Sequence, residues 1–203
     1  MNMQQLSFFP EEEGLLFPSD TLQYFPSFLE GKASLKLMDL LQTTVPWRQQ
    51  TLTIHGKIVQ TPRLTAWYGD PKSHYQFSGT RLHPLPWTKP LLTLKQEVSS
   101  LVQAPFNSVL LNYYRDGRDS VAWHSDDERE LGEYPLIASV SLGQERRFEF
   151  RKKEDHGQRY SLTLANGSLL IMKGALQKDW QHRIPKSTTA MIPRINLTFR
   201  NIE

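Results

Sequence analysis

A histidine and an aspartate two residues apart, His124 and Asp126, are the side chains best placed to do chemistry in this chain of 203 residues. Residues two apart on an extended strand point to the same face, so an imidazole nitrogen and a carboxylate oxygen can reach one ion. A histidine beside acidic residues is more often part of a solvated charge cluster, and Asp127 and Glu128 follow directly. The pair therefore needs a third ligand before it indicates a metal site.

His182, in a run that follows a predicted strand and turn, is the candidate third ligand. Two histidines and one carboxylate form the facial set that leaves positions open on a non-haem Fe(II) ion. An oxygenase needs open positions, because a co-substrate and dioxygen must bind the same ion. The same three ligands can also hold zinc with a bound water, so the residues alone leave the metal undecided.

The C-terminal run RINLTFR alternates polar and apolar side chains. On a strand, Arg194, Asn196 and Arg200 lie on one face, where two guanidinium groups suit the two carboxylates of a small dicarboxylic acid. The alternative is an edge strand with its apolar residues in the core and its polar residues in solvent. Asn112 and Tyr114 are also two apart, so a strand would direct both to one side.

Two helices and many short strands are predicted to position these side chains. Apolar residues recur at helical spacing from Phe28 to Leu41 and from Leu91 to Val102. Short β-prone runs between Gln49 and Gly79 predict hairpins, and strands separated by turn residues dominate after Pro105. This pattern is typical of a sandwich or jelly roll. We expect a mainly β fold with flanking helices, of the α+β class.

The composition predicts a soluble protein. Hydrophobic residues make up 38% of the chain and charged residues 22%, and no run approaches the roughly 18 apolar residues that a membrane span requires. The chain has no cysteine, which excludes disulfides and thiolate metal ligands. The N-terminus does not resemble a secretory signal. The net charge of +3 suits a polyanionic partner without identifying one.

The motifs HSDDE, DWQHRIPK and PRINLTFR, in this order, resemble the AlkB family of Fe(II)/2-oxoglutarate-dependent dioxygenases. NYYRDG and SVSLGQERRFEFR are also similar to segments of that family, and the similarity runs from about Pro62 to Arg200. Within the family the chain is most similar to the animal members that repair alkylated DNA. The resemblance implies a double-stranded β-helix, or jelly roll, in a single dioxygenase domain over residues 21–203, after an irregular arm at residues 1–20.

The resemblance also implies roles for the residues at the matching positions. His124, Asp126 and His182 would bind Fe(II), and Arg194 would pair with the distal carboxylate of 2-oxoglutarate. The residues that would support the rest of the co-substrate are Asn112, Tyr114, Asn196 and Arg200.

Hairpins at about residues 49–80 resemble the nucleotide-recognition lid of the family. A base taken out of its stack can recover about 1–3 kcal/mol by stacking on an aromatic side chain. Phe77 is the first candidate for this contact, with Tyr75 and Trp67 near it. The alternative is that these aromatics are core residues of a hairpin.

Two further residues are candidate substrate contacts by resemblance. Asp127 would accept a hydrogen bond from an exocyclic amine of the base, or would be a solvated acid. His55 stands where a duplex-preferring relative has a bulky apolar residue that fills the gap left by the flipped base. Histidine is a poorer wedge, which argues against a strict preference for duplex DNA.

The implied reaction is oxidative dealkylation of 1-methyladenine and 3-methylcytosine in DNA, with RNA left open as a substrate. It would consume O2 and 2-oxoglutarate and release formaldehyde, succinate and CO2. The alternatives are the same fold acting on a protein or another non-nucleic substrate, and a non-catalytic nucleic-acid-binding module. We expect a monomer without a membrane partner, cytoplasmic in a bacterium and nuclear in a eukaryote.

A basic cluster follows the predicted strand after the first metal ligands, and it would either contact phosphates or form a solvated face. Acidic residues interleaved with it dilute its charge. Its members are Arg146, Arg147, Arg151, Lys152 and Lys153.

Overall fold

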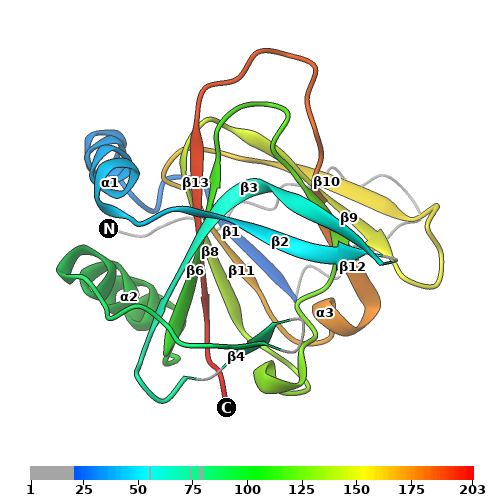
Figure 1. The fold of residues 1–203 in the computed structure, drawn as a ribbon, viewed down its shortest axis with the longest axis horizontal. Coiled ribbons are helices and arrows are strands. Elements are labelled where there is room, and N and C mark those ends of the chain that lie inside the picture. Colours follow the sequence, from blue (N-terminus) through cyan, green and yellow to red (C-terminus); the bar gives the residue numbers. More distant parts are fainter. Residues whose placement is uncertain (1–20, 55, 74, 78–79) are drawn as a thin grey trace.

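Two antiparallel sheets packed face to face organise the computed structural model, which describes residues 21–54, 56–73, 75–77 and 80–203 (Figure 1). The larger sheet has, in spatial order, β1 (Leu22–Phe25), β11 (Leu169–Met172), β8 (Ile137–Gly143), β13 (Arg194–Arg200), β6 (Ser108–Tyr114), β3 (Lys57–Gly69) and β2 (Arg48–Ile54). The smaller sheet has β10 (Arg159–Leu164), β9 (Arg146–Lys152), β12 (Trp180–Ile184) and β7 (Val121–His124). A separate hairpin joins β4 (Tyr75–Phe77) to β5 (Thr80–Leu82).

Helices α1 (Gly31–Thr44) and α2 (Lys89–Val102) lie together on one side of the larger sheet (Figure 1). The first helix begins three residues later than its apolar spacing suggested, because Glu30 is extended, with a ψ of 148°. The second carries proline in its first turn, where no intrahelical donor is needed. It ends at Gln103, whose φ of 54° is left-handed. Two short helices complete the fold, α3 (Leu176–Asp179) and a 3-10 turn (Arg129–Leu131).

The central strands of the larger sheet are buried on both faces, and the two faces differ in polarity. On β13, Ile195, Leu197 and Phe199 belong to the core beneath the helices. The intervening Arg194 and Asn196 turn toward the smaller sheet, where they line a cavity. The strand periodicity of two therefore gives β13 an apolar face for the helices and a polar face for the space between the sheets.

A second core fills part of the space between the sheets. Phe150, Leu170 and Trp180 are among its buried members, and the Phe148 and Phe150 rings meet edge to face with centroids 4.7 Å apart. The same space also contains the cavity that Arg194 and Asn196 line. The apolar contacts hold the sheets together around it.

The expected mainly β jelly-roll architecture with buttressing helices is confirmed, but one alternative is wrong. β13 is not an edge strand, because it pairs with β6 on one side and with β8 on the other. Its polar face also lies in the protein interior, because Arg194 and Asn196 are both buried. In the described residues, no helix combines the length and the apolar character that a membrane crossing demands. The predicted arm at residues 1–20 and His55 lie outside the described residues.

Candidate active site

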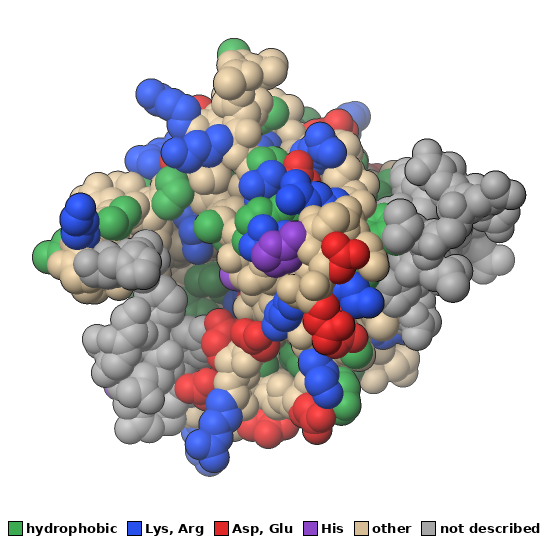
Figure 2. Space-filling view, turned by 90° about the vertical axis from the view of Figure 1, so that its right-hand side faces the viewer, with side chains coloured by type: hydrophobic (Ala, Val, Ile, Leu, Met, Phe, Trp, Pro, Cys, Tyr) green, Lys and Arg blue, Asp and Glu red, His purple; other side chains and the backbone are tan. Residues whose placement is uncertain are grey.

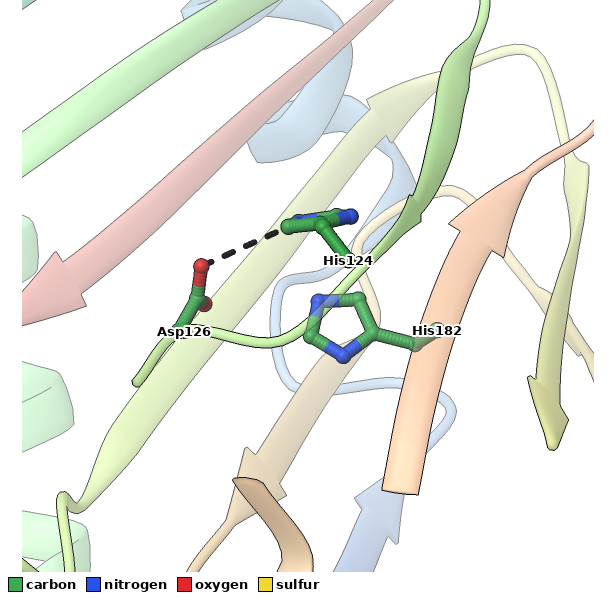
Figure 3. Close-up of side chains that lie close together, drawn as sticks. All are labelled: His124, Asp126 and His182. Atoms are coloured by element: carbon green, nitrogen blue, oxygen red, sulfur yellow. Dashed lines mark ion pairs between the residues drawn. The ribbon is translucent and has the colours of Figure 1, made fainter. Parts of the chain in front are cut away.

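Three side chains with metal-ligand chemistry, His124, Asp126 and His182, meet at one end of the smaller sheet (Figure 3). One potential ligand atom from each lies within 4.8 Å of the other two. The two histidines are direct partners across β7 and β12, and their ring centroids are 4.2 Å apart. The sheet register thus brings together two residues that lie far apart in the sequence, and one ion could contact all three side chains.

An irregularity in β7 gives the first histidine its direction. His124 pairs with His182 and Val121 pairs with Ile184, so β7 uses one residue more than β12 between the two pairs. This is the geometry of a β-bulge, which re-aims side chains. Val121 packs on the inner core, and the extra residue lets His124 face inward as well. The β-bulge in β7 therefore orients the side chain of His124 toward the space between the sheets.

Asp126 does not share an extended strand with His124, contrary to the expectation, because β7 ends at His124. Two contacts position it instead. Its backbone N–H donates to Oε1 of buried Gln177 at 2.9 Å, and Nη2 of Arg200 donates to its Oδ1 at 2.9 Å. Asp126 is therefore held by α3 through its backbone N–H and by β13 through its carboxylate.

The charges around Asp126 keep it ionised. Burial alone would raise the pKa of this carboxyl, but Arg200, His182 and His124 together bring its pKa well below the ordinary range. A carboxylate at this position can therefore act as an anionic metal ligand.

His182 is buried and neutral. Burial, aided by the nearby charge of His124, lowers the pKa of its imidazole to about 3, against the opposing influence of Asp126.

The ring nitrogens of His124 have separate roles. Nδ1 lies 2.9 Å from the carbonyl of Ala122, so a proton on Nδ1 leaves Nε2, 3.8 Å from Asp126 Oδ1, to bind a metal.

A cavity of about 390 Å³ lies between the sheets beside these three residues. It brings together most of the residues expected to bind metal, co-substrate or base. Those that line it are Trp67, Asn112, Tyr114, His124, Asp126, His182, Arg194, Asn196 and Arg200.

Arg194 places a buried cation in this cavity. Its side chain is 1% exposed, and Nη2 donates to Oγ of Ser141 at 2.9 Å, whereas Nε and Nη1 have no hydrogen-bond partner. Burial lowers the pKa of its guanidinium to about 10, partly opposed by Tyr114, so it remains charged near neutral pH. A buried cation with unused donors is costly unless an anion binds it. Arg194 therefore fits a carboxylate group of a co-substrate.

The other predicted co-substrate residues surround Arg194 but already make contacts of their own. The Tyr114 ring lies 5.1 Å from the Arg194 guanidinium carbon. Asn112 Oδ1 accepts from Nε of Arg63 at 2.7 Å. The Asn196 amide donates to Oγ of Ser139 at 2.7 Å, which holds β13 to β8. These contacts fix the walls on either side of the cation.

The predicted base contacts are less closely grouped. Trp67 lines the cavity, and Tyr75 and Phe77 form β4 of the small hairpin. Asp127 is not among the lining residues. Its carboxylate is 58% exposed and forms an ion pair with Nζ of Lys153 at 2.9 Å.

Sequence reasoning missed three residues that the structure brings to the site: Gln177, Arg63 and Glu128. Gln177 accepts a hydrogen bond from the backbone N–H of Asp126, Arg63 donates to Asn112, and Glu128 lines the cavity. A neutral side chain in a four-residue helix carries no recognisable signal. Arg63 could have been found from the sequence, because it directly precedes a β-prone run and arginine is rarely buried without a partner.

The chain is similar in sequence to known oxygenases. The family model of the 2OG-Fe(II) oxygenase superfamily matches residues 21–200. The chain is 46% identical over 186 residues to alpha-ketoglutarate-dependent dioxygenase alkB homolog 3 of Bos taurus, covering 87% of this chain and 64% of that relative. It is 43% identical over 156 residues to DNA oxidative demethylase ALKBH2 of Homo sapiens, covering 73% of this chain and 60% of that relative. The chain thus spans less than two thirds of the length of these relatives.

A solved structure shares the fold at low sequence identity. The structure of OsALKBH1 covers 93% of this chain and 99% of its own chain, with a TM-score of 0.64 and 16% identity. The jelly-roll expectation is confirmed by this likeness, which concerns the fold.

Replacing Gln177 with leucine should weaken metal binding without removing a metal ligand. The change leaves the buried N–H of Asp126 without its acceptor, which costs about 1–3 kcal/mol. We expect lower stability in chemical denaturation and a higher dissociation constant for Mn(II). Gln60→Leu, at an exposed position of β3, is the matched control. Unchanged Mn(II) affinity in Gln177→Leu would show that the hydrogen bond does not position the carboxylate.

The metal-free protein should lose stability as the pH falls from about 6.5 toward 3. The unfolded chain takes up a proton on His182 near its ordinary pKa of 6.5, whereas the folded chain does so only near a pKa of about 3. Each such proton adds a slope of about 1.4 kcal/mol per pH unit to the free energy of unfolding. His182→Asn should reduce that slope in denaturant titrations, and exposed His156→Asn is the control. An equal slope in the wild type and His182→Asn would contradict the buried neutral imidazole.

Proposed function

The chain belongs to the AlkB family within the 2OG-Fe(II) oxygenase superfamily, and from this premise we propose that it is an Fe(II)- and 2-oxoglutarate-dependent dioxygenase that removes N-alkyl groups from DNA bases. One observation carries the proposal. A buried arginine with unused donors and a His/Asp/His set line the same cavity. A metal site alone would not need that cation, and a structural metal site would not need the cavity.

The ligand set fits Fe(II). Two neutral imidazole nitrogens and one carboxylate leave coordination positions free for small molecules. When bound, Fe(II) would supply the electrons for reaction with O2, while 2-oxoglutarate is oxidised to succinate and CO2. Zinc also accepts this set, but Zn²⁺ has no redox chemistry and could not supply electrons to O2.

The cavity side chains of the larger sheet would hold 2-oxoglutarate. Arg194 would bind its distal carboxylate, with charge-assisted hydrogen bonds from Nε or Nη1. Tyr114 packs against this guanidinium, and Asn112 is held at the next inward position by Arg63. Arg200, which contacts Asp126, would set the position of the metal-binding carboxylate relative to the co-substrate.

The proposed substrates are 1-methyladenine and 3-methylcytosine in DNA. Their oxidised N-methyl group would leave as formaldehyde. The name of one relative, DNA oxidative demethylase ALKBH2, supports methylated DNA as the substrate class. Trp67 supplies an aromatic wall inside the cavity, and Phe77 and Tyr75 lie in the hairpin that we assign to the lid.

We also assign Asp127 to base recognition, although it now pairs with Lys153. An ion pair this exposed contributes only about 0–1 kcal/mol. An exocyclic amine of a bound base could therefore replace Lys153 at little cost. The contact would place a carboxylate acceptor beside the metal ligand that precedes it in the chain.

Turnover on a methylated oligonucleotide tests the proposal. With Fe(II), O2 and 2-oxoglutarate, the protein should convert 1-methyladenine to adenine and release formaldehyde, as measured by mass spectrometry of the oligonucleotide. His182→Ala should lower the rate by more than about 100-fold, because residues that merely orient metal ligands already change activity by about 10- to 100-fold. His156→Ala, on an exposed loop, should retain the wild-type rate. Absence of turnover on every methylated oligonucleotide would refute the assignment.

A further inference from the structure

The outer face of the smaller sheet carries a second, smaller cleft of about 180 Å³. Strand alternation separates it from the cavity, since Phe148 and Phe150 of β9 point inward to the core while Arg147 lines the cleft. On β12, His182 points inward and Arg183 lines the cleft. The cleft and the cavity thus lie on opposite faces of the same strands.

Arginines gather around this cleft. Arg147, Arg159 and Arg183 line it, and Arg151 contacts Trp123, another lining residue. Both Arg151 and Arg183 place their guanidinium carbon 4.5 Å from the centre of the Trp123 ring. Figure 2 views the side where Figure 1 draws β9, β10 and β12, and it shows basic side chains gathered in the upper part of that face.

The positive charge of the cluster is not neutralised within the cleft. Glu149 is the acidic residue that lines it, and it pairs with Arg183 at 2.6 Å and with Arg147 at 3.3 Å. Burial, together with the charges of Arg159 and Arg183, lowers the pKa of Arg151, so these cations lie close enough to repel one another. Four arginines against one glutamate leave an excess of positive charge.

The sequence cluster that was expected to contact phosphates is divided by the fold. Arg146 is 2% exposed and donates to the carbonyls of Asp119 and Pro185. Lys153 pairs with Asp127. Arg147 and Arg151 remain on the outer face, where Arg159 and Arg183 from other strands join them.

We propose that this cleft binds backbone phosphates of the nucleic-acid strand that flanks the base held in the cavity, an inference that rests on the proposed function. Guanidinium groups match phosphate oxygens with paired N–H donors, and contacts with the Trp123 ring hold two of them in place. Trp123 directly precedes the metal ligand His124 on β7, the edge strand of the smaller sheet. A strand that leaves the cavity therefore reaches the cleft by crossing one edge strand.

The salt dependence of binding to an unmethylated single-stranded oligonucleotide tests the cleft. The double variant Arg147→Gln/Arg159→Gln removes two cations and spares Arg183, which neighbours a metal ligand. Each lost phosphate contact should reduce the slope of log K against log salt by about 0.7. We therefore expect the slope to fall by up to about 1.4 units, measured by fluorescence anisotropy on the full chain with Mn(II) and 2-oxoglutarate.

Lys32→Gln/Lys36→Gln is the matched control, because it removes the same net charge from exposed positions of α1, on the opposite side of the molecule in Figure 1. It should keep the wild-type slope. An equal loss in both variants would mean that net charge alone matters and would overturn the proposal. A polyglutamate peptide should compete more weakly than the oligonucleotide. If it competed as strongly, and if this competition were lost in the cleft variant, the cleft would be assigned to an acidic protein and the proposal would also be overturned.

Turnover separates this proposal from the proposed function. The cleft variant should lower kcat/KM on a long methylated oligonucleotide but not on a methylated trinucleotide, which is too short to reach the cleft. Normal turnover of the long oligonucleotide with an unchanged salt slope would refute the cleft alone. A reduced salt slope in the variant, with no turnover by the wild type, would refute the demethylase activity and retain the phosphate site.

Discussion

The ion pair between Arg200 and Asp126 joins the two sheets at the point where the chemistry is proposed to occur. Arg200 ends β13 of the larger sheet, and Asp126 follows β7 of the smaller one. Both side chains are largely buried, and removal of one partner from a buried pair costs about 3–5 kcal/mol. The contact therefore fixes the distance between the sheets and keeps the carboxylate ionised for a metal. Without Arg200, the two histidines alone would not anchor the carboxylate of Asp126.

Burial of charge also explains the arrangement of the larger sheet. A strand that carries Arg194 and Arg200 on one face cannot bury that face in an apolar core without partners for the two charges. The arginines of β13 face the cavity between the sheets, while α1 and α2 cover the apolar face of the same strand. These two helices contribute no residue to the candidate metal site and act on it only through the packing of β13.

Features with a strong local pattern were predictable from the sequence, and features that depend on register were not. The apolar spacing identified both long helices, and the alternation in RINLTFR identified the cationic face of β13. His124, Asp126 and His182, which the structure brings together, could be singled out because their residue types carry metal-ligand chemistry. Sequence alternation could not tell a central strand from an edge strand, because both have the same period. The bulge that directs His124 and the Gln177 hydrogen bond depend on contacts between distant segments. The grouping of Arg147, Arg159 and Arg183 around one cleft also arises only from the packing of β10 and β12 on either side of β9.

The central claim is that metal and co-substrate meet in one cavity built from both sheets. An anaerobic titration of 2-oxoglutarate into the Fe(II)-loaded protein tests it, since direct binding of the co-substrate to the iron gives visible absorption. We predict saturation at one equivalent and no signal in His182→Ala. The dissociation constant of 2-oxoglutarate should be at least about tenfold higher in Arg194→Met than in the exposed control Arg118→Met, because hydrogen bonds to charged groups contribute about 1.5–3 kcal/mol. Equal affinity in Arg194→Met and the wild type, or no absorption at any concentration of 2-oxoglutarate, would contradict the account.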